Sequence, residues 1–319
     1  VSKGRSRLFS VGYLKEQIIS YVNSLDLPFE TDFAVEDTPL GTGGGIRLAM
    51  GKCRGDKTVV VNADTFYPVD LGALPFTAPV TMALKPMKDF DRYGAVELSG
   101  GKVTAFREKE HCRQGLVNGG VYALSGLDLS PFPEKFSFEK EVLEPLAAGG
   151  GVNGRVQDRY FIDIGIPEDY LRAQRELPEY QAVKFASKAL LATDADTLFL
   201  DRDGTLNRRI PGDYVRRPGQ LEFLPGVLEE FPLWAEKFRR IIVVTNQRGV
   251  GRGLMSGEDL RDVHSSMLSA VNEAGGRIDA ILACTDTEDS SPRRKPNTGM
   301  YEDALSLFPD RSEEHTSEL

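Results

Sequence analysis

The hydrophobic and polar positions of the first 177 residues alternate between strand-like and helix-like patterns. Apolar residues run together at 58–64, 79–84, 120–124 and 161–165, which predicts strands, the first of them buried. The segment 94–108 has two β-patterned arms joined through Ser99-Gly100-Gly101, which predicts a hairpin. Helices are predicted near the start, around 137–147 and from Pro167 onward.

The pattern weakens from 178 to 196, which predicts a linker with one short helix, and a second series then begins. Continuous apolar strands are predicted at 197–201, 240–246 and 280–285, with helices at 226–237, 257–274 and 298–308. Such strands are typical of sheets covered on both faces. We therefore expect two α/β domains, 1–177 and 197–310, each a mostly parallel sheet flanked by helices. A chain of 319 residues has room for both.

The last nine residues, 311–319, have no periodicity. Their sequence, RSEEHTSEL, resembles what a common sequencing adapter encodes when it is read as protein, and a polar tail is the alternative. We leave this segment out of the fold prediction.

Composition excludes several classes of protein. The net charge of −9 argues against nucleic-acid binding through a basic surface. No apolar run reaches the roughly 18 to 20 residues of a membrane span, and no signal peptide opens the chain. The 3 cysteines lie too far apart for a disulfide framework. We expect a soluble, cytoplasmic protein without membrane or nucleic-acid partners.

The sequence DRDGT follows the predicted strand 197–201 and places Asp201 and Asp203 on one loop. In doubly wound sheets, ligands bind beyond the carboxyl ends of the strands. Asp201 would attack phosphorus, Asp203 would act as general acid and base, and Mg²⁺ held by both would screen the phosphate charge. An EF-hand is excluded because Leu206 and Gly212 stand where glycine and glutamate are needed. A plain helix cap remains open.

Two later segments supply groups for the same site. Thr245 and Asn246 end the next predicted strand, where a hydroxyl and an amide suit phosphate oxygens. Arg294 and Lys295 follow the third strand and would neutralise the phosphate. Taken separately, the first segment is an ordinary polar loop and the second a solvated charged face.

Together DRDGTLN, VVTNQRGVGRG and RKPNTGM resemble the haloacid dehalogenase superfamily, and more narrowly its heptose bisphosphate and histidinol phosphatases. The resemblance covers 197–310. It implies that Asp201 is the nucleophile, Asp203 the acid/base, Thr245 and Lys295 the phosphate-holding pair, and Arg294 a substrate contact.

Two departures from that family matter. Many members carry a zinc loop of three cysteines and a histidine, whereas this chain has Cys284 followed by TDTEDSSPR, so we expect no zinc. A later acidic motif that completes the family's magnesium site is not found before the tail. We therefore expect the phosphatase half to be incomplete.

The first half has a glycine-rich segment, TPLGTGGGI, predicted to be a loop entering a helix. It matches neither G-x-x-x-x-G-K-[ST] nor G-x-G-x-x-G, and a flexible turn is the alternative to a ligand-facing loop. Asp64 and Asp163 each end a predicted strand, where two carboxylates would share one Mg²⁺. Each is equally well explained as a helix cap.

PLGTGGGI, NAD, NGGVYAL, FSFEKEVLEPL and FIDIGIPEDY, in this order, resemble the sugar-1-phosphate nucleotidyltransferases, with the heptose-1-phosphate guanylyltransferases as the nearest group. The resemblance spans about 8–177. It implies that Asp64 and Asp163 bind Mg²⁺. Residues facing the base or lining the sugar side would be Gly41, Thr42, Gly43, Gly44, Tyr93, Gly94, Glu108, Asn118, Gly119, Glu139 and Lys140.

The family's first strand and its G-x-G-T-R-L loop, which bind the triphosphate, are not found in this half. From the usual size of a strand–helix–strand unit, on the order of 50 residues would be missing. We therefore expect little activity from either half of these 319 residues.

The two resemblances imply a bifunctional enzyme of nucleotide-activated heptose synthesis for surface glycans. A phosphatase would convert heptose 1,7-bisphosphate to the 1-phosphate, which the transferase would couple to GTP. The nearer alternative keeps this chemistry on another sugar phosphate, another nucleotide or histidinol phosphate. An alternative of another class is a non-catalytic sugar-nucleotide-binding protein. Fold alone does not decide between them.

Overall fold

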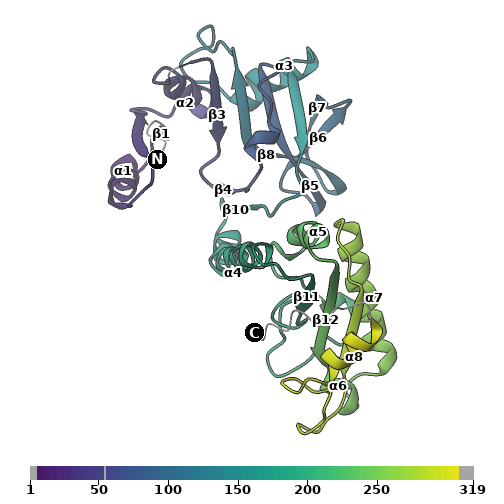
Figure 1. Cartoon of the computed structure of the whole chain (residues 1–319). Helices are drawn as coiled ribbons and strands as arrows, with labels where there is room; N and C mark the ends of the chain where they lie inside the picture. The colour runs from purple at the N-terminus through teal and green to yellow at the C-terminus, as the bar shows by residue number, and fades with distance from the viewer. Residues whose placement is uncertain (1–5, 54, 309–319) are drawn as a thin grey trace. The chain divides into compact units, whose positions relative to one another are not determined.

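The computed structural model describes residues 6–53 and 55–308, so the expectation for 311–319 lies outside the described part. The chain forms two compact units, Val1–Ile166 and Pro167–Leu319. In Figure 1 the first runs from purple to teal and the second from green to yellow. In the described part of the chain, no helix is long and apolar enough to span a bilayer.

A six-stranded sheet forms the centre of the first unit. Its strand order is β3-β8-β5-β9-β7-β6. The strands are β3 (Lys57–Val61), β5 (Val80–Phe90), β6 (Gly94–Ser99), β7 (Lys102–Lys109), β8 (Cys112–Ser125) and β9 (Val152–Val156). The predicted hairpin is confirmed as β6 and β7. One face packs against helices through a core that includes Met82, Tyr122, Phe138 and Leu143.

Strand direction corrects one expectation for this unit. The α/β class is confirmed, but within the six-stranded sheet only β5 and β9 pair in parallel, and the other pairs are antiparallel. A hydrophobic run indicates that a strand is buried but does not indicate whether it runs parallel or antiparallel to its neighbours. β3 is also less buried than expected, with Val59 39% and Val61 56% exposed. Among the described strands it pairs with β8 alone.

Smaller elements complete the first unit. β1 (Ser6–Val11) and β2 (Glu30–Val35) form a separate parallel pair, with α1 (Lys15–Ser24) between them in the chain. α2 (Gly41–Met50) follows β2, and β4 (Thr65–Phe66) pairs with β10 (Ile162–Asp163). The predicted helix at 137–147 is a π-helical turn, Glu139–Leu143, that continues into α3 (Glu144–Ala148).

The second unit is built on three parallel strands in the order β11-β12-β13. They are β11 (Thr197–Leu200), β12 (Arg240–Asn246) and β13 (Ala280–Cys284). The helices are α5 (Val227–Lys237), α6 (Arg248–Gly251), α7 (Gly257–Glu273) and α8 (Gly299–Leu307). The strands and the three longer helices confirm the elements predicted for this half. Parallel pairing places the carboxyl ends of all three strands at one edge.

The predicted linker is mostly helical. α4 (Pro167–Leu191) runs without a break through Pro178, whose ring and missing N–H normally interrupt a helix. Its second half packs on the second unit: Tyr180 is buried, and Val183 and Leu190 contact the core around Phe231. This burial offsets the cost of the proline, and α4 lies beside α5 (Figure 1). The division therefore falls at Ile166, before the boundary at 177 expected from the sequence.

Candidate functional sites

The carboxyl edge of the β11-β12-β13 sheet brings the phosphatase-like residues together. Asp201 directly follows β11, and Lys295 Nζ lies 2.8 Å from its Oδ1. Lys295 also donates to the carbonyl oxygen of Val244 at 2.8 Å. Asn246 holds the Lys295 backbone from both sides, accepting from its N–H and donating to its carbonyl, each at 3.1 Å. Three segments distant in sequence thus meet at one point.

Asp203 lies in a dense cage of hydrogen-bond donors. Its carboxylate accepts from Arg202 Nη2 at 2.9 Å, from Asn207 Nδ2 at 3.0 Å and from Gln247 Nε2 at 2.7 Å. Gln247 Nε2 also donates to Thr245 Oγ1 at 2.8 Å. These hydrogen bonds fix the Asp203 carboxylate and the hydroxyl of the buried residue Thr245. Thr245 is one of the two residues predicted to hold phosphate.

Two oxygens in this cage lack a hydrogen-bond partner. They are Oδ1 of Asn207 and Oε1 of Gln247, both buried. Buried acceptors without a donor are costly, and hard oxygen atoms are the ligands that Mg²⁺ prefers. Both described contacts of the Asp201 carboxylate are made to Oδ1, from Lys295 Nζ and from the Arg202 N–H. The residues present therefore fit a divalent cation beside Asp201.

Arg202 and His264 are members of this site that the motif comparison missed. The Arg202 side chain is fully buried, and its Nη1 lies 3.2 Å from His264 Nε2 on α7. Burial, and then the positive charge of Arg202, lower the pKa of His264 to about 4. In the sequence, only the position of Arg202 between two aspartates could have indicated that it belongs to the site. The position of His264 beside Arg202 could not be predicted, because it depends on how α7 packs.

Arg294 is placed on the loop that follows β13. It forms an ion pair with Asp289 at 3.0 Å, and Arg248 contacts the same Asp289 oxygen. Hydrogen bonds from Arg248 and Arg294 lower the pKa of Asp289 below its usual range. Both guanidinium groups are mostly buried, and Arg248 Nε and Arg294 Nη1 have no hydrogen-bond partner. Arg294 on this loop and Arg248 at the start of α6 thus share one exposed carboxylate, that of Asp289.

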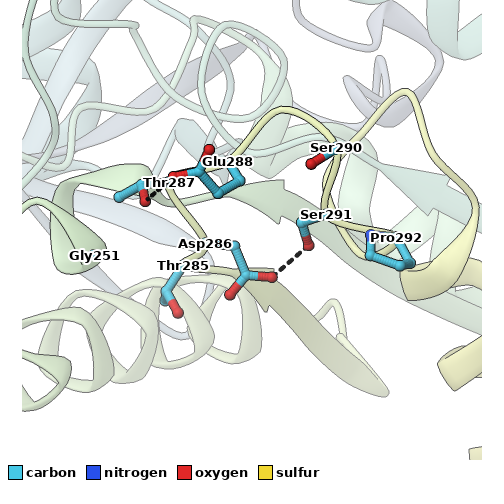
Figure 2. Close-up of a pocket in the computed structure, with 8 residues that line it drawn as sticks. All are labelled: Gly251, Thr285, Asp286, Thr287, Glu288, Ser290, Ser291 and Pro292. Carbon is cyan, nitrogen blue, oxygen red and sulfur yellow. Dashed lines mark hydrogen bonds between the residues drawn. The ribbon is translucent and has the colours of Figure 1, made fainter.

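The same loop forms an open cavity of about 560 Å³ (Figure 2). Ser291 Oγ donates to Asp286 and Thr287 Oγ1 to Glu288 across its wall. None of the residues predicted for the site lines it. The lining residues are Gly251, Thr285, Asp286, Thr287, Glu288, Ser290, Ser291 and Pro292.

In the first unit, the start of α2 is tied to the segment before α3. Thr42 Oγ1 donates to Glu139 Oε2 at 2.6 Å and accepts from the Phe138 N–H at 2.9 Å. Ser137 Oγ donates to the same Glu139 oxygen at 2.9 Å and accepts from the Lys140 N–H. Thr42, Glu139 and Lys140, predicted from separate motifs, therefore lie in one cluster.

The glycines of TPLGTGGGI belong to the first turns of α2 and do not form an open loop. A Cβ on Gly43 would lie 2.2 Å from the Phe136 ring, and one on Gly44 would lie 2.5 Å from the Glu134 carbonyl oxygen. Gly41 has φ +72° and a Cβ position blocked by the Phe136 carbonyl. The close approach that requires glycine here is made by the chain itself. Contact of these residues with a base stays a prediction.

Asp64 and Asp163 are brought together by the short β4–β10 pairing, in which Asp163 lies opposite Thr65. Thr65 Oγ1 donates to Asp64 at 3.2 Å, and the Gly165 N–H donates to Asp163 at 2.7 Å. Neither residue begins a helix, so the helix-cap interpretation is wrong for both. Carboxylate oxygens are ligands that Mg²⁺ prefers, so the chemistry of Asp64 and Asp163 fits the ion, and their joint binding of it stays a prediction.

Asn118 and Gly119 lie at an irregularity of β8. Pairing with β5 shifts between Met82 and Leu84, opposite this stretch. Asn118 donates to the Tyr122 hydroxyl at 2.7 Å, and a Cβ on Gly119 would meet the Tyr67 ring at 2.3 Å. Tyr67, missed from the sequence, is thus a neighbour of the predicted sugar side.

Three further predicted residues lie in or just before the strands β6 and β7. Tyr93 packs edge-on against Phe161 at 5.8 Å between ring centroids. Gly94 pairs with Lys109 across the hairpin, and a Cβ there would lie 2.4 Å from the Arg107 carbonyl oxygen. Glu108 is exposed near the end of β7. Nothing in these contacts identifies a ligand.

Throughout 6–53 and 55–308, no three or more His, Cys, Asp and Glu side chains gather as a metal-binding group. Metal binding by Asp64 with Asp163, and by Asp201 with Asp203, therefore stays a prediction.

Comparison with known proteins assigns the two halves separately. The second half is 42% identical over 117 residues to a D-glycero-α-D-manno-heptose-1,7-bisphosphate 7-phosphatase of Mycobacterium tuberculosis, covering 35% of this chain and 60% of that protein. The chain thus spans less than two thirds of that relative.

The first half resembles a D-glycero-α-D-manno-heptose 1-phosphate guanylyltransferase of Aneurinibacillus thermoaerophilus, 41% identical over 180 residues, covering 54% of this chain and 78% of that protein. The crystal structure of HddC from Yersinia pseudotuberculosis aligns with a TM-score of 0.50 and 32% identity, over 54% of this chain and 78% of that one. The family model described as nucleotidyl transferase matches residues 13–179. The chain belongs to the nucleotidyl transferase family.

Proposed function

We propose that the chain is part of a bifunctional enzyme that makes nucleotide-activated heptose. The carrying observation is that one chain joins a half similar to a heptose-1-phosphate guanylyltransferase to a half similar to a heptose-1,7-bisphosphate 7-phosphatase. Removal of the 7-phosphate leaves a 1-phosphate, which is the substrate named for the first relative. Two reactions that follow one another chemically are thus encoded together.

The phosphatase reaction uses the groups at the carboxyl edge of β11-β12-β13. Asp201 attacks phosphorus, the bond from phosphorus to the sugar oxygen breaks, and an aspartyl phosphate forms. Asp203 gives a proton to the departing sugar oxygen and later takes one from the water that hydrolyses the intermediate. Thr245, Asn246 and Lys295 hold the phosphate oxygens, and Arg294 contacts the rest of the substrate. When bound at Asp201 and Asp203, Mg²⁺ supplies positive charge that offsets the phosphate dianion.

In the transferase reaction, a sugar 1-phosphate oxygen attacks the α-phosphorus of GTP and pyrophosphate leaves. Asp64 and Asp163 would hold Mg²⁺, and the bound ion would supply positive charge that offsets the charge of the triphosphate. The start of α2, with Thr42 and Glu139, lies toward the nucleotide. Asn118, Gly119 and Tyr93 lie toward the sugar. The contact between Thr42 and Glu139 supports placing these two residues in one site, and the choice of GTP rests on the relative's name.

The test is a substrate panel. Phosphate release is measured for heptose 1,7-bisphosphate, other sugar phosphates and histidinol phosphate, with the 319-residue chain and any longer product of the same gene. We expect preference for the heptose bisphosphate, loss with EDTA and loss in Asp201→Asn. Asp194→Asn, an exposed aspartate before β11, is the matched control.

Preference for another substrate would overturn the assignment of heptose. Binding of GTP or heptose 1-phosphate without turnover, unchanged by Asp201→Asn, would instead indicate a non-catalytic binding protein.

A further inference from the structure

Within the described part of the chain, Arg202 is the largest side chain whose exposed fraction is near zero, and it lies inside the phosphatase-like site. Guanidinium stays charged in proteins and carries only donors, so burying it requires acceptors on every edge. One edge is satisfied by Asp203, through Nη2 at 2.9 Å and 3.1 Å and through Nε at 3.3 Å. The opposite nitrogen, Nη1, faces α7.

His264 supplies the acceptor on that side, with Nε2 3.2 Å from Arg202 Nη1. Because Arg202 can only donate, Nε2 must carry a lone pair, which requires a neutral imidazole with its proton on Nδ1. The low pKa of His264 agrees with a neutral ring at pH 7. α7 begins with a capping box between Ser256 and Asp259 and buries Leu260, Val263 and Met267, so His264 is presented from a fixed helix.

We propose that His264 is a positioning residue for phosphoryl transfer: it orients Arg202, and Arg202 in turn holds Asp203 toward the reacting oxygen. The proposal rests on the proposed function, since it needs Asp203 as the acid/base. His264 itself contacts neither Asp203 nor the groups that hold phosphate in any described hydrogen bond. It therefore acts on the step that moves a proton and leaves phosphate binding to Thr245 and Lys295.

The geometry predicts a separation between kcat and KM. In His264→Leu, Arg202 Nη1 loses its hydrogen-bond acceptor, and the guanidinium group can rotate away from Asp203. We expect kcat to fall about 10- to 100-fold, a part of what general acid–base catalysis contributes, with KM within about 2-fold. His264→Gln keeps an acceptor oxygen on a side chain of similar reach, so kcat should stay within about 3-fold of the original. Ser265→Ala, the exposed neighbour on α7, is the control.

A second measurement does not depend on turnover. Nitrogen chemical shifts of the imidazole report which ring nitrogen carries the proton, and we expect the Nδ1–H form for His264 at pH 7. The Nε–H of Arg202 should exchange slowly in the original chain and in His264→Gln. It should exchange at least about 10-fold faster in His264→Leu, because one anchor of the guanidinium is lost.

The outcomes separate the two proposals. An Nε2–H tautomer, or unchanged exchange at Arg202 in His264→Leu, would overturn the positioning role even in a chain with no turnover. Equal kcat in His264→Leu and the original enzyme would do the same. If no phosphate ester is hydrolysed while the tautomer and exchange results hold, the proposed phosphatase function fails and the Arg202–His264 contact stands as a structural one.

Discussion

Lys295 Nζ lies 2.8 Å from Asp201 Oδ1, so the ammonium that would bind phosphate already neutralises the carboxylate that would attack it. The same Nζ donates to the Val244 carbonyl oxygen, which anchors it to β12. The lysine thus stands between strand and nucleophile before any substrate arrives.

Replacing Lys295 with methionine should lower phosphatase kcat/KM by about 100-fold or more, since positive charge aimed at the transferring phosphate is removed. Initial rates of phosphate release measure this. Lys237→Met, at an exposed position of α5, is the matched control. Guanylyl transfer should be unchanged, and an equal loss in both reactions would indicate unfolding.

His264 should make the second unit less stable in mild acid. Its pKa falls from 6.5 to about 4 on folding, so between these values the unfolded chain takes up a proton that the folded chain refuses. Stability is complete above pH 6.5 and decreases as pH falls toward 4, by at most about 3 kcal/mol.

Trp234, the one tryptophan of the chain, lies in the core of this unit and reports its unfolding by fluorescence in urea. His264→Gln should flatten the decrease in stability between pH 7 and 4.5. His111→Gln, an exposed histidine of the first unit, should leave it unchanged. An identical slope in all three proteins would show that protonation of His264 is not the cause of the acid sensitivity.

Gly43→Ala should destabilise the first unit by about 2 kcal/mol, because its methyl group would overlap the Phe136 ring. Thermal unfolding by circular dichroism measures the change, with Trp234 fluorescence as an internal reference for the other unit. Phe136→Leu in the same chain should recover part of the loss. Additive losses in the double variant would show that the clash is not the cause.

Asp289→Asn should lower KM for a bisphosphorylated substrate about 2- to 5-fold. Arg248 and Arg294 now share the Asp289 carboxylate, which competes with any substrate anion at this loop. The effect should shrink at high salt, where exposed charges are screened. Glu288→Gln, the neighbouring carboxylate, is the control. A higher KM would mean that Asp289 holds the arginines in place for the substrate.

The sequence was most informative for residues at the carboxyl ends of parallel strands, because these ends lie at one edge of the sheet and ligands bind there. Asp201, Thr245 and Lys295 each follow a strand of a parallel sheet or end one, and such strands deliver their ends to one edge. Their meeting could therefore be predicted without coordinates. Asp64 and Asp163 were expected together on the same reasoning; β4 and β10 pair antiparallel and set Asp163 opposite Thr65, the residue after Asp64, and shared Mg²⁺ binding stays a prediction.

The remainder depended on tertiary packing. Hydrophobic runs do not encode strand direction, so the antiparallel pairs of the six-stranded sheet were not predictable. The glycines of α2 suggested a loop entering a helix because Phe136, which packs against them, is remote in sequence. His264 belongs to none of the sequence motifs, so its contact with Arg202 could not be predicted before the packing of α7 was known.

Helix α4 has a practical consequence for dividing the protein. Tyr180, Lys184 and Ser187 all contact α5, and Ser187 accepts from Trp234 Nε1 at 2.9 Å. A piece expressed from residue 197, where its first strand begins, would expose the α5 surface that α4 covers and remove Lys184 and Ser187, the partners of Glu230. A piece beginning at Pro167 retains both, so the cut that preserves the second activity lies one whole helix ahead of the first catalytic strand.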